Sequence, residues 1–161
     1  MVNAKRILFV CTGNSCRSVM AEGLMRQVLQ RAGIDTVAVE SAGIFAVSGM
    51  QPTRETLLVL HDIGVDASAH RARMLTTQMV ESADLIFVME QFQWDEVTRR
   101  FPSFRSKAHL LKTYGLSAPD PEANPNIPDP IGKPLEVYEV CFTNIREAVE
   151  RIARSLGVHT T

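Results

Sequence analysis

The sequence contains no apolar run near the roughly 20 residues that a membrane-spanning helix needs. Its first residues also lack the apolar stretch of a secretory signal peptide. The sequence also has no excess of charge of either sign, because it contains 17 Lys and Arg residues and 18 Asp and Glu residues, for a net charge of −1. Nucleic-acid-binding domains usually carry a clear basic excess. We therefore expect neither a membrane nor a nucleic acid as a partner.

The sequence contains only three cysteines. Because this number is small and odd, they do not make the disulfide framework of a small secreted protein. We expect the protein in a reducing, cytoplasmic environment, where thiols stay free. The four histidines are scattered and do not show the spacing of metal ligands. We therefore expect an activity that needs no metal and no cofactor.

What is present is an ordinary globular composition of 161 residues, 45% of them hydrophobic and 22% charged. This length suits one domain with a sizeable core. The sequence shows no internal repeat, and no linker divides it. We expect a single domain over residues 1–161.

Short apolar segments alternate with segments of helical periodicity, which is typical of βαβ units and of a parallel sheet covered by helices on both faces. The expected strands are residues 5–10, 36–40, 84–89 and 108–111. The expected helices are residues 18–32, 53–63, 76–81 and 91–100, and a last helix that opens at Pro134 and buries Tyr138, Cys141, Phe142, Ile145, Val149, Ile152 and Leu156. In such α/β folds, ligands bind at the carboxyl ends of the strands.

The most informative stretch is Cys11-Thr12-Gly13-Asn14-Ser15-Cys16-Arg17-Ser18, which joins the first expected strand to the first expected helix. The first N–H groups of a helix have no internal partner and carry partial positive charge, so the loop predicts an anion site. Gly13 and Asn14 suit a loop whose backbone folds closely around an anion. A thiol at a helix N-terminus beside an arginine ionises readily, so Cys11 is a candidate nucleophile.

A candidate acid lies in the segment Ile127-Pro128-Asp129-Pro130, because prolines on both sides hold Asp129 on a stiff, extended loop. A phosphate ester's leaving group needs a proton, which a carboxylic acid can supply. Asp120, between Pro119 and Pro121, has the same form. Spacing alone does not choose between the two.

Four motifs together resemble the low molecular weight protein tyrosine phosphatase family: Cys11-x5-Arg17-Ser18, Ser41-Ala42-Gly43, His70-x-x-Arg73 and Asp129-Pro130. They occur in the family's order and span nearly the whole chain. The resemblance implies a four-stranded parallel sheet in one three-layer domain, with the phosphate loop after the first strand. It also selects Asp129 over Asp120, because in the family the Asp-Pro pair lies a few residues before the last helix.

The resemblance implies a two-step mechanism, in which Cys11 forms a phosphocysteine, Arg17 binds two phosphoryl oxygens, and Asp129 acts first as acid and then as base. The remaining expected roles are substrate binding by Thr12, Gly13, Asn14, Ser15, Cys16, Ser18 and Phe45, and support of the loop by Ser41 and His70. For His70, an ordinary surface histidine is an equal alternative. The resemblance also implies a reversible disulfide between Cys11 and Cys16 that shields the nucleophile.

The resemblance predicts hydrolysis of phosphotyrosine in phosphorylated proteins, with inorganic phosphate as product. Protein arginine phosphatase activity is the alternative, since that branch resembles this chain around Phe45 and Ile131 and has Thr where this chain has Ser15. Phe45 is a candidate wall of the substrate pocket. One departure from the family pattern is Glu90, where many members have Asp.

Two further functions fit the loop less well. The loop sequence from Cys11 to Ser18 also resembles that of thioredoxin-coupled arsenate reductases. Those enzymes need two more cysteines after the third strand, and residues 89–95 contain none. A phosphopeptide-binding module would use the same anion loop, but it would need neither Cys11 nor Asp129.

Overall fold

The computed structural model describes residues 2–159, and its centre is a sheet of four parallel strands. In sequence the strands are β1 (Arg6–Cys11), β2 (Ala38–Gly43), β3 (Leu85–Val88) and β4 (Ala108–Leu110). They lie side by side in the order β2-β1-β3-β4. Because all four are parallel, every connection between them crosses over the sheet, and the predicted α/β class is confirmed.

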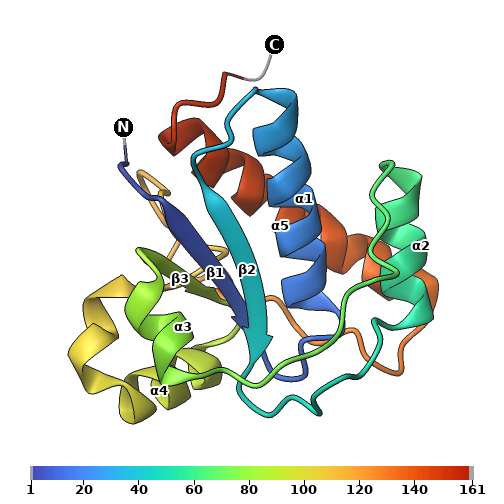
Figure 1. The fold of residues 1–161 in the computed structure, drawn as a ribbon, viewed down its shortest axis with the longest axis horizontal. Helices are drawn as coiled ribbons and strands as arrows, with labels where there is room; N and C mark the ends of the chain where they lie inside the picture. Colours follow the sequence, from blue (N-terminus) through green and yellow to red (C-terminus); the bar gives the residue numbers. More distant parts are fainter. Residues whose placement is uncertain (1, 160–161) are drawn as a thin grey trace.

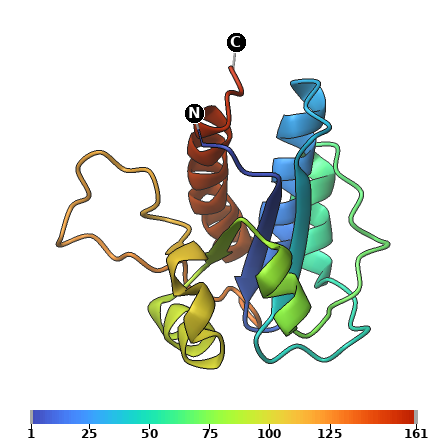
Figure 2. The ribbon, with the colours of Figure 1, turned by 60° about the vertical axis from the view of Figure 1, so that its left-hand side comes forward.

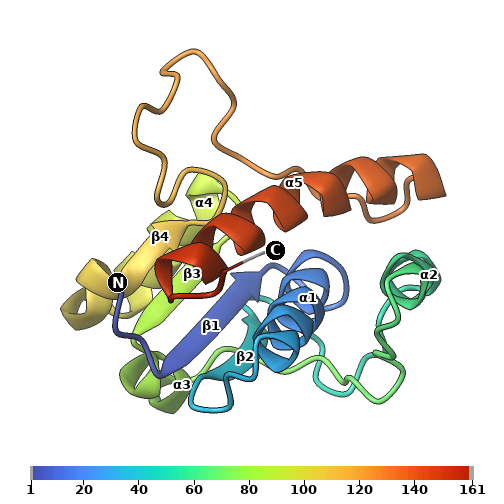
Figure 3. The ribbon, with the colours of Figure 1, turned by 90° about the horizontal axis from the view of Figure 1, so that it is seen from above.

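Helices cover both faces of the sheet, as the near-continuous apolar strands require. One face packs against α1 (Arg17–Arg31) and α5 (Leu135–Ser155), and α2 (Arg54–Asp62) packs against these two helices. The other face packs against α3 (Thr77–Ser82), α4 (Gln91–Arg100) and the 3-10 helix η1 (Pro102–Lys107). Figure 3 shows the long helix α5 running across the sheet on the side of α1.

The side chains of β1 divide between two separate hydrophobic cores. Ile7, Phe9 and Cys11 belong to the core beneath α1 and α5, whereas Leu8 and Val10 belong to the core beneath α3 and α4. This alternation follows from the period of two residues in a strand. It places the end of β1, at Cys11, on the face that α1 covers.

The second strand lies further along the chain than the sequence predicts. Residues 36–40 are the expected strand, but β2 begins at Ala38 and ends at Gly43, and so includes Ser41-Ala42-Gly43. The reason is tertiary pairing: Ser41 and Gly43 lie opposite Phe9 and Cys11 in the β1–β2 ladder. That pairing outweighs the turn propensity of Ser and Gly.

Most other boundaries agree with the prediction within one or two residues. Helix α4 has the predicted bounds, and Thr76 caps α3 by accepting a hydrogen bond from the Met79 backbone. Helices α1 and α2 are followed by Gly33 and Gly64, both at positive φ as a helix-ending glycine requires. Nowhere in residues 2–159 is there a helix with both the length and the apolar character for crossing a membrane.

The carboxyl ends of the strands meet at one end of the molecule. In Figure 1 the arrowheads of β1 and β2 point toward this end, where several connecting loops gather. The chain between β4 and α5 is different, since Figure 2 shows it as an arch that projects from the body of the protein. The two ends of this arch, at Leu111 and Ile127, belong to the core beneath α5.

Candidate active site

The Cys11 thiol lies at the carboxyl end of β1 and is buried. Its Sγ is 2.9 Å from Ser18 Oγ, and it accepts a hydrogen bond from the Asn14 backbone N–H at 3.3 Å. The Asn14 side chain donates to Ser18 Oγ at 2.8 Å, which leaves the Ser18 hydroxyl hydrogen free to point at Cys11. Two donors therefore converge on the sulfur.

Asn14 fixes the shape of the phosphate loop. It is fully buried and adopts the left-handed conformation, with φ of 54°. Its amide nitrogen donates to Ser18 and, at 2.9 Å, to Ser41, while its amide oxygen accepts from the Arg73 backbone at 3.1 Å. Three side-chain hydrogen bonds therefore hold Asn14 in this uncommon conformation.

Beyond Asn14 the loop presents free backbone donors. Within the part of the chain that the structure describes, the N–H groups of Ser15, Cys16, Arg17 and Ser18 have no hydrogen-bond partner in the protein. No side chain caps α1 at this end, and its first turn contains no acid. An anion at this helix N-terminus would satisfy these donors and interact favourably with the helix dipole.

The glycine that the loop geometry requires is Gly43, at the end of β2. A Cβ atom there would lie 2.6 Å from the Thr12 carbonyl oxygen and 3.0 Å from the Asn14 nitrogen. At Gly13 a Cβ atom would meet only Ser15 Oγ, at an ordinary 3.6 Å. Gly43 therefore lets β2 pack directly against the loop, whereas the protein itself would have room for a side chain at Gly13.

Arg17 is almost completely buried, and acidic groups hold its guanidinium in place. Its Nη1 donates to Glu90 Oε2 at 2.6 Å and to the Ile127 carbonyl at 2.8 Å, and its Nη2 lies 3.5 Å from Asp129 Oδ2. Burial alone would lower the pKa of Arg17, but Cys11, Glu90 and Asp129 more than offset it and raise the pKa above its ordinary value. The positive charge is therefore permanent.

One donor of this guanidinium has no partner. Among residues 2–159, Arg17 Nε is the only buried side-chain nitrogen or oxygen atom without a hydrogen bond. Buried polar groups are nearly always paired, so an unpaired one needs an explanation. A phosphoryl oxygen between Arg17 and the loop N–H groups would supply the missing acceptor.

Asp129 lies beside Arg17, and Asp120 does not. The Asp129 side chain is 38% exposed, and its Oδ1 accepts a hydrogen bond from the Ile131 backbone at 3.1 Å. Asp120 is exposed on the arch, where it accepts from the Glu122 backbone and borders a hollow against α5. Of the two acids that the sequence left open, the structure brings only Asp129 to the loop.

Behind the loop lies a chain of polar groups that includes Ser41 and His70. Ser41 Oγ donates to Glu22 Oε2 at 2.6 Å, and His70 Nε2 is 3.0 Å from the Asn14 carbonyl oxygen, so this nitrogen carries the hydrogen. His70 Nδ1 faces Glu22 at 3.6 Å. Sequence reasoning missed Glu22, which lies on the buried face of α1. The available signal was an acidic residue among the apolar positions of that helix, where acids are rare unless they are paired.

Cys16 and Ser15 lie at the start of α1 and are also buried. The Cys16 sulfur has three hydroxyl neighbours, Ser15 at 3.8 Å, Thr53 at 3.5 Å and Tyr138 at 3.6 Å. Tyr138 was expected only as a core residue of the last helix. Its hydroxyl finds its partner at this sulfur, as a buried tyrosine hydroxyl usually finds one.

Cys141 lies one turn further along α5 than Tyr138. It is buried within the core, as the apolar stripe of the last helix predicts. Burial raises the pKa of the Cys141 thiol to about 12. This cysteine therefore stays protonated at neutral pH, unlike a catalytic thiol.

Gln93 is a second buried polar residue that sequence reasoning missed. Its Oε1 accepts from the backbone N–H groups of Met89 and Glu90, at 2.8 and 3.1 Å, and its Nε2 donates to Thr12 Oγ1 at 3.1 Å. It therefore ties the phosphate loop to the start of α4, where Glu90 holds Arg17. The signal in the sequence was the Glu90-x-x-Gln93 spacing, which is that of a capping box.

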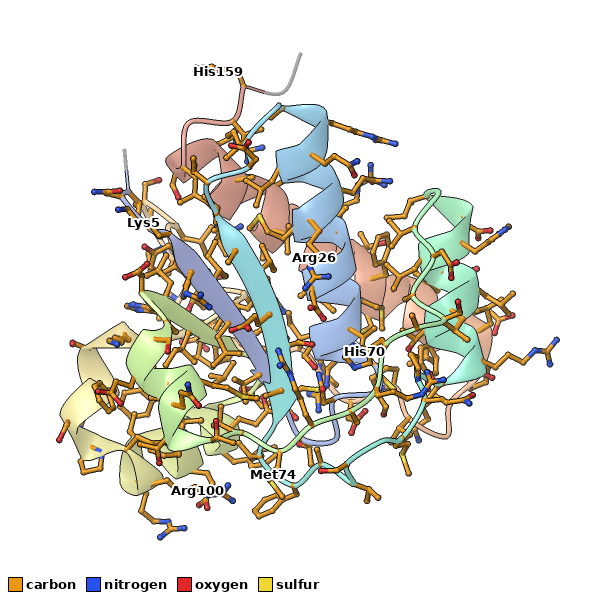
Figure 4. All side chains as sticks on the ribbon, viewed as in Figure 1. Lys5, Arg26, His70, Met74, Arg100 and His159 are labelled. Atoms are coloured by element: carbon orange, nitrogen blue, oxygen red, sulfur yellow. The ribbon has the colours of Figure 1, made fainter. Side chains whose placement is uncertain are left out.

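Phe45 has its backbone at the loop and its ring outside the core. Its N–H donates to the Thr12 carbonyl at 3.0 Å, while its side chain is 56% exposed. The Arg100 guanidinium lies over the ring, 5.0 Å from the centroid, and donates to the Ile44 carbonyl. Figure 4 shows Arg100 at the end of the molecule toward which the strands point.

The described residues contain no group of three or more His, Cys, Asp and Glu side chains that could hold a metal ion. The chemistry available at the site is that of one buried thiol, one buried guanidinium, one partly exposed carboxyl group and a ring of backbone donors. This set suits attack on a phosphoryl group.

Comparison with known proteins gives the same chemistry. The family model for "Low molecular weight phosphotyrosine protein phosphatase" matches residues 6–160. A protein-arginine-phosphatase of Geobacillus stearothermophilus is 36% identical over 151 residues, 94% of this chain and 95% of the relative. The probable low molecular weight protein-tyrosine-phosphatase EpsP of Ralstonia nicotianae is 38% identical over 146 residues, 91% of this chain and 92% of the relative.

A similar solved structure is that of the YwlE arginine phosphatase, in a Cys-to-Ser variant with a phosphorylated active-site serine. It superposes with a TM-score of 0.85 at 30% identity, covering 94% of this chain and 95% of the other. The similarity thus extends over nearly the full length of both chains, in sequence and in fold. The chain belongs to the low molecular weight phosphotyrosine protein phosphatase family, whose members remove phosphate from phosphorylated proteins.

Proposed function

We propose that residues 1–161 act as one phosphatase domain that hydrolyses phosphotyrosine in proteins through a phosphocysteine on Cys11. The observation that carries this proposal is the convergence of three groups. The buried Cys11 thiol lies among donors, Arg17 lacks a partner at Nε, and Asp129 lies 3.5 Å from Arg17. A module that only bound phosphopeptides would need the donors but not the thiol and the carboxyl group.

In the first step the Cys11 thiolate attacks phosphorus, the bond from phosphorus to the leaving oxygen breaks, and Asp129 gives its proton to that oxygen. The phosphoryl oxygens lie against the N–H groups of residues 15–18 and accept from Arg17 Nε and Nη2. The Ser18 hydroxyl, 2.9 Å from Cys11, stabilises the sulfur as a thiolate.

In the second step Asp129, now a carboxylate, takes a proton from a water molecule as that water attacks phosphorus. The sulfur–phosphorus bond breaks, Cys11 leaves as a thiolate, and inorganic phosphate is released. The cycle balances without a metal ion or cofactor. Thr12, Gly13, Asn14, Ser15 and Cys16 contribute the walls and backbone of the loop, and Ser41 and His70 hold its shape.

Turnover of p-nitrophenyl phosphate in the presence of a chelator tests the catalytic groups. We expect Cys11→Ser to abolish turnover and Asp129→Ala to slow it by about 10²- to 10⁴-fold, the usual contribution of a general acid. Asp120→Ala is the matched control, since it removes an acid with the same proline neighbours, and it should leave the rate unchanged. Turnover by Cys11→Ser, or equal losses from the two aspartate variants, would contradict the assignment.

Phosphoarginine is the second candidate substrate, and two of the relatives reported above favour it because they are named arginine phosphatases. Side-by-side kcat/KM values for one peptide carrying phosphotyrosine or phosphoarginine at the same position decide between them. A preference for phosphotyrosine supports the proposal, and a preference for phosphoarginine replaces the substrate without changing the roles of Cys11 and Arg17.

A further inference from the structure

A hollow of about 610 Å³ lies behind the phosphate loop, and Asp129 is not among the residues that line it. It is lined by residues of α1, by the chain between Gly64 and Arg73, and by Ser41 of β2. Figure 4 shows two of its residues, Arg26 on α1 and His70 on the facing chain. Its size falls in the range of ligand pockets, and nothing in the phosphatase reaction uses it.

Three arginines line this hollow, and each has N–H groups to spare. Arg71 donates only to the Ser68 and His70 carbonyls, and no carboxylate lies within 4.0 Å of it among residues 2–159. Arg73 donates to the Ser41 carbonyl and lies 3.8 Å from Glu40.

The third arginine, Arg26, donates to the Val39 carbonyl and pairs with Glu22 at 2.8 Å. Two acids, Glu22 and Asp66, also line the hollow. Both are already engaged, because Glu22 bonds to Arg26 and Ser41, and Asp66 accepts from the Ser68 backbone. The charged groups of the hollow that keep unused hydrogen-bonding capacity are therefore guanidinium donors, and the Gln27 and Gln30 amides line it beside them.

We propose that this hollow is a second binding site, which takes a small organic anion with two or more negative charges. The carboxylate or phosphate groups of such a ligand would accept from Arg26, Arg71 and Arg73, in the geometry that guanidinium groups favour. Val19, Val65 and Ala67 supply apolar wall for its carbon skeleton. The site goes beyond the proposed catalytic function, and its occupancy does not depend on the phosphatase reaction.

The hollow is connected to the nucleophile by an unbroken series of contacts. Arg26 pairs with Glu22 at 2.8 Å, Glu22 accepts from Ser41 at 2.6 Å, and Ser41 accepts from Asn14 at 2.9 Å. Asn14 donates to Ser18, which lies 2.9 Å from Cys11. An anion that binds Arg26 competes with Glu22 for it, so binding changes the hydrogen bonds that hold Asn14. We expect the ligand to change kcat more than KM.

Amide NMR titrations of the wild-type protein with citrate and, separately, with inorganic pyrophosphate test this site. We expect saturable shifts of the Gly23 and Gly64 resonances, both in the wall of the hollow, with one or both probes. Arg71→Gln should weaken the response about tenfold, because it removes a charged hydrogen-bond donor. Arg31→Gln is the control, since Arg31 is an exposed α1 residue that does not line the hollow.

Two results would overturn the proposal. One is a titration in which both probes shift only phosphate-loop resonances such as Gly13, because the anions would then bind the active site alone. The other is equal affinity in Arg71→Gln and wild type, because the hollow's arginines would then have no part in binding. Neither result bears on Cys11 chemistry, which the p-nitrophenyl phosphate assay measures separately.

Discussion

Replacing Gly43 by alanine adds a single methyl group at the point where β2 touches the phosphate loop. That methyl carbon would lie 2.6 Å from the Thr12 carbonyl oxygen, 2.9 Å from Ala46 Cβ and 3.0 Å from the Asn14 nitrogen. Two of these three neighbours are backbone atoms of the loop, so no flexible side chain can move aside. Gly43 does not have a positive φ, so the conflict is one of space and not of backbone strain.

Ordinary contact begins at 3.4 Å, so the loop and β2 must separate by about 0.4–0.8 Å. Overpacking of this kind costs about 1–3 kcal/mol of folding free energy. A displacement of nearly 1 Å in a catalytic loop costs up to about 10²-fold in rate. We therefore expect Gly43→Ala to remain folded, with a modestly lower midpoint in urea and a kcat/KM reduced about 10- to 100-fold.

Gly23→Ala is the matched control, because it adds the same methyl group to a glycine outside the loop. There the new carbon would meet side-chain atoms of Val65 at 3.2 Å and Leu60 at 3.3 Å, which can adjust. Alanine also suits a helix interior better than glycine by about 1 kcal/mol. We expect near wild-type stability and kcat/KM for Gly23→Ala. Wild-type kcat/KM for Gly43→Ala would refute the argument that close packing of β2 shapes the loop.

Glu90→Gln removes the charge that holds Arg17 Nη1 at 2.6 Å, so we expect it to lower the free energy of unfolding in urea by about 1–3 kcal/mol and to lower kcat/KM. The control is Glu96→Gln in α4, which should leave kcat/KM unchanged. Equal effects of the two variants on kcat/KM would contradict the role of the Arg17–Glu90 pair. Because burial raises the pKa of Cys141 to about 12, iodoacetamide near neutral pH should label it last of the cysteines in peptide mapping, and early labelling would show that it is accessible or ionised. Asp84 accepts from two backbone N–H groups that lower its pKa, so its stabilising effect is present above its ordinary pKa of 3.8 and is lost as pH falls through the lowered value. The stability difference between wild type and Asp84→Asn should therefore shrink on acidification, and a pH-independent difference would exclude this explanation.

The fold and its ligand-binding edge could be predicted from local sequence. Alternating apolar and helical segments predict the parallel sheet, and the strand-loop-helix order around Cys11 predicts where an anion would bind. Gly33 marks the end of α1 because a left-handed residue is needed there. These features depend on neighbours within a few residues, which a sequence displays directly.

The parts that escaped prediction depend on contacts between distant segments. Glu22 and Gln93 lie inside helices, where a polar residue usually faces solvent. Their partners are 19 and 81 residues away, at Ser41 and Thr12, and no local pattern joins them. The same reason explains the shift of β2, because its extent is fixed by pairing with β1 and not by its own residues.

The choice between Asp129 and Asp120 is a related case. Both acids lie between prolines, so local sequence is equally compatible with either. The choice depends on the path of the arch, which brings the Ile127 carbonyl to 2.8 Å from Arg17 and leaves Asp120 outside. Only the family resemblance carried that information at the level of sequence.

The central claim is that Cys11 itself carries the phosphoryl group during turnover. Rapid quenching of wild-type enzyme with a phosphotyrosine peptide, followed by peptide mapping under neutral conditions, tests it directly. The account predicts one phosphoryl group on the peptide that contains Cys11 of the wild-type enzyme. Quenched wild-type enzyme that turns over substrate but carries no phosphoryl group on Cys11 would contradict the account.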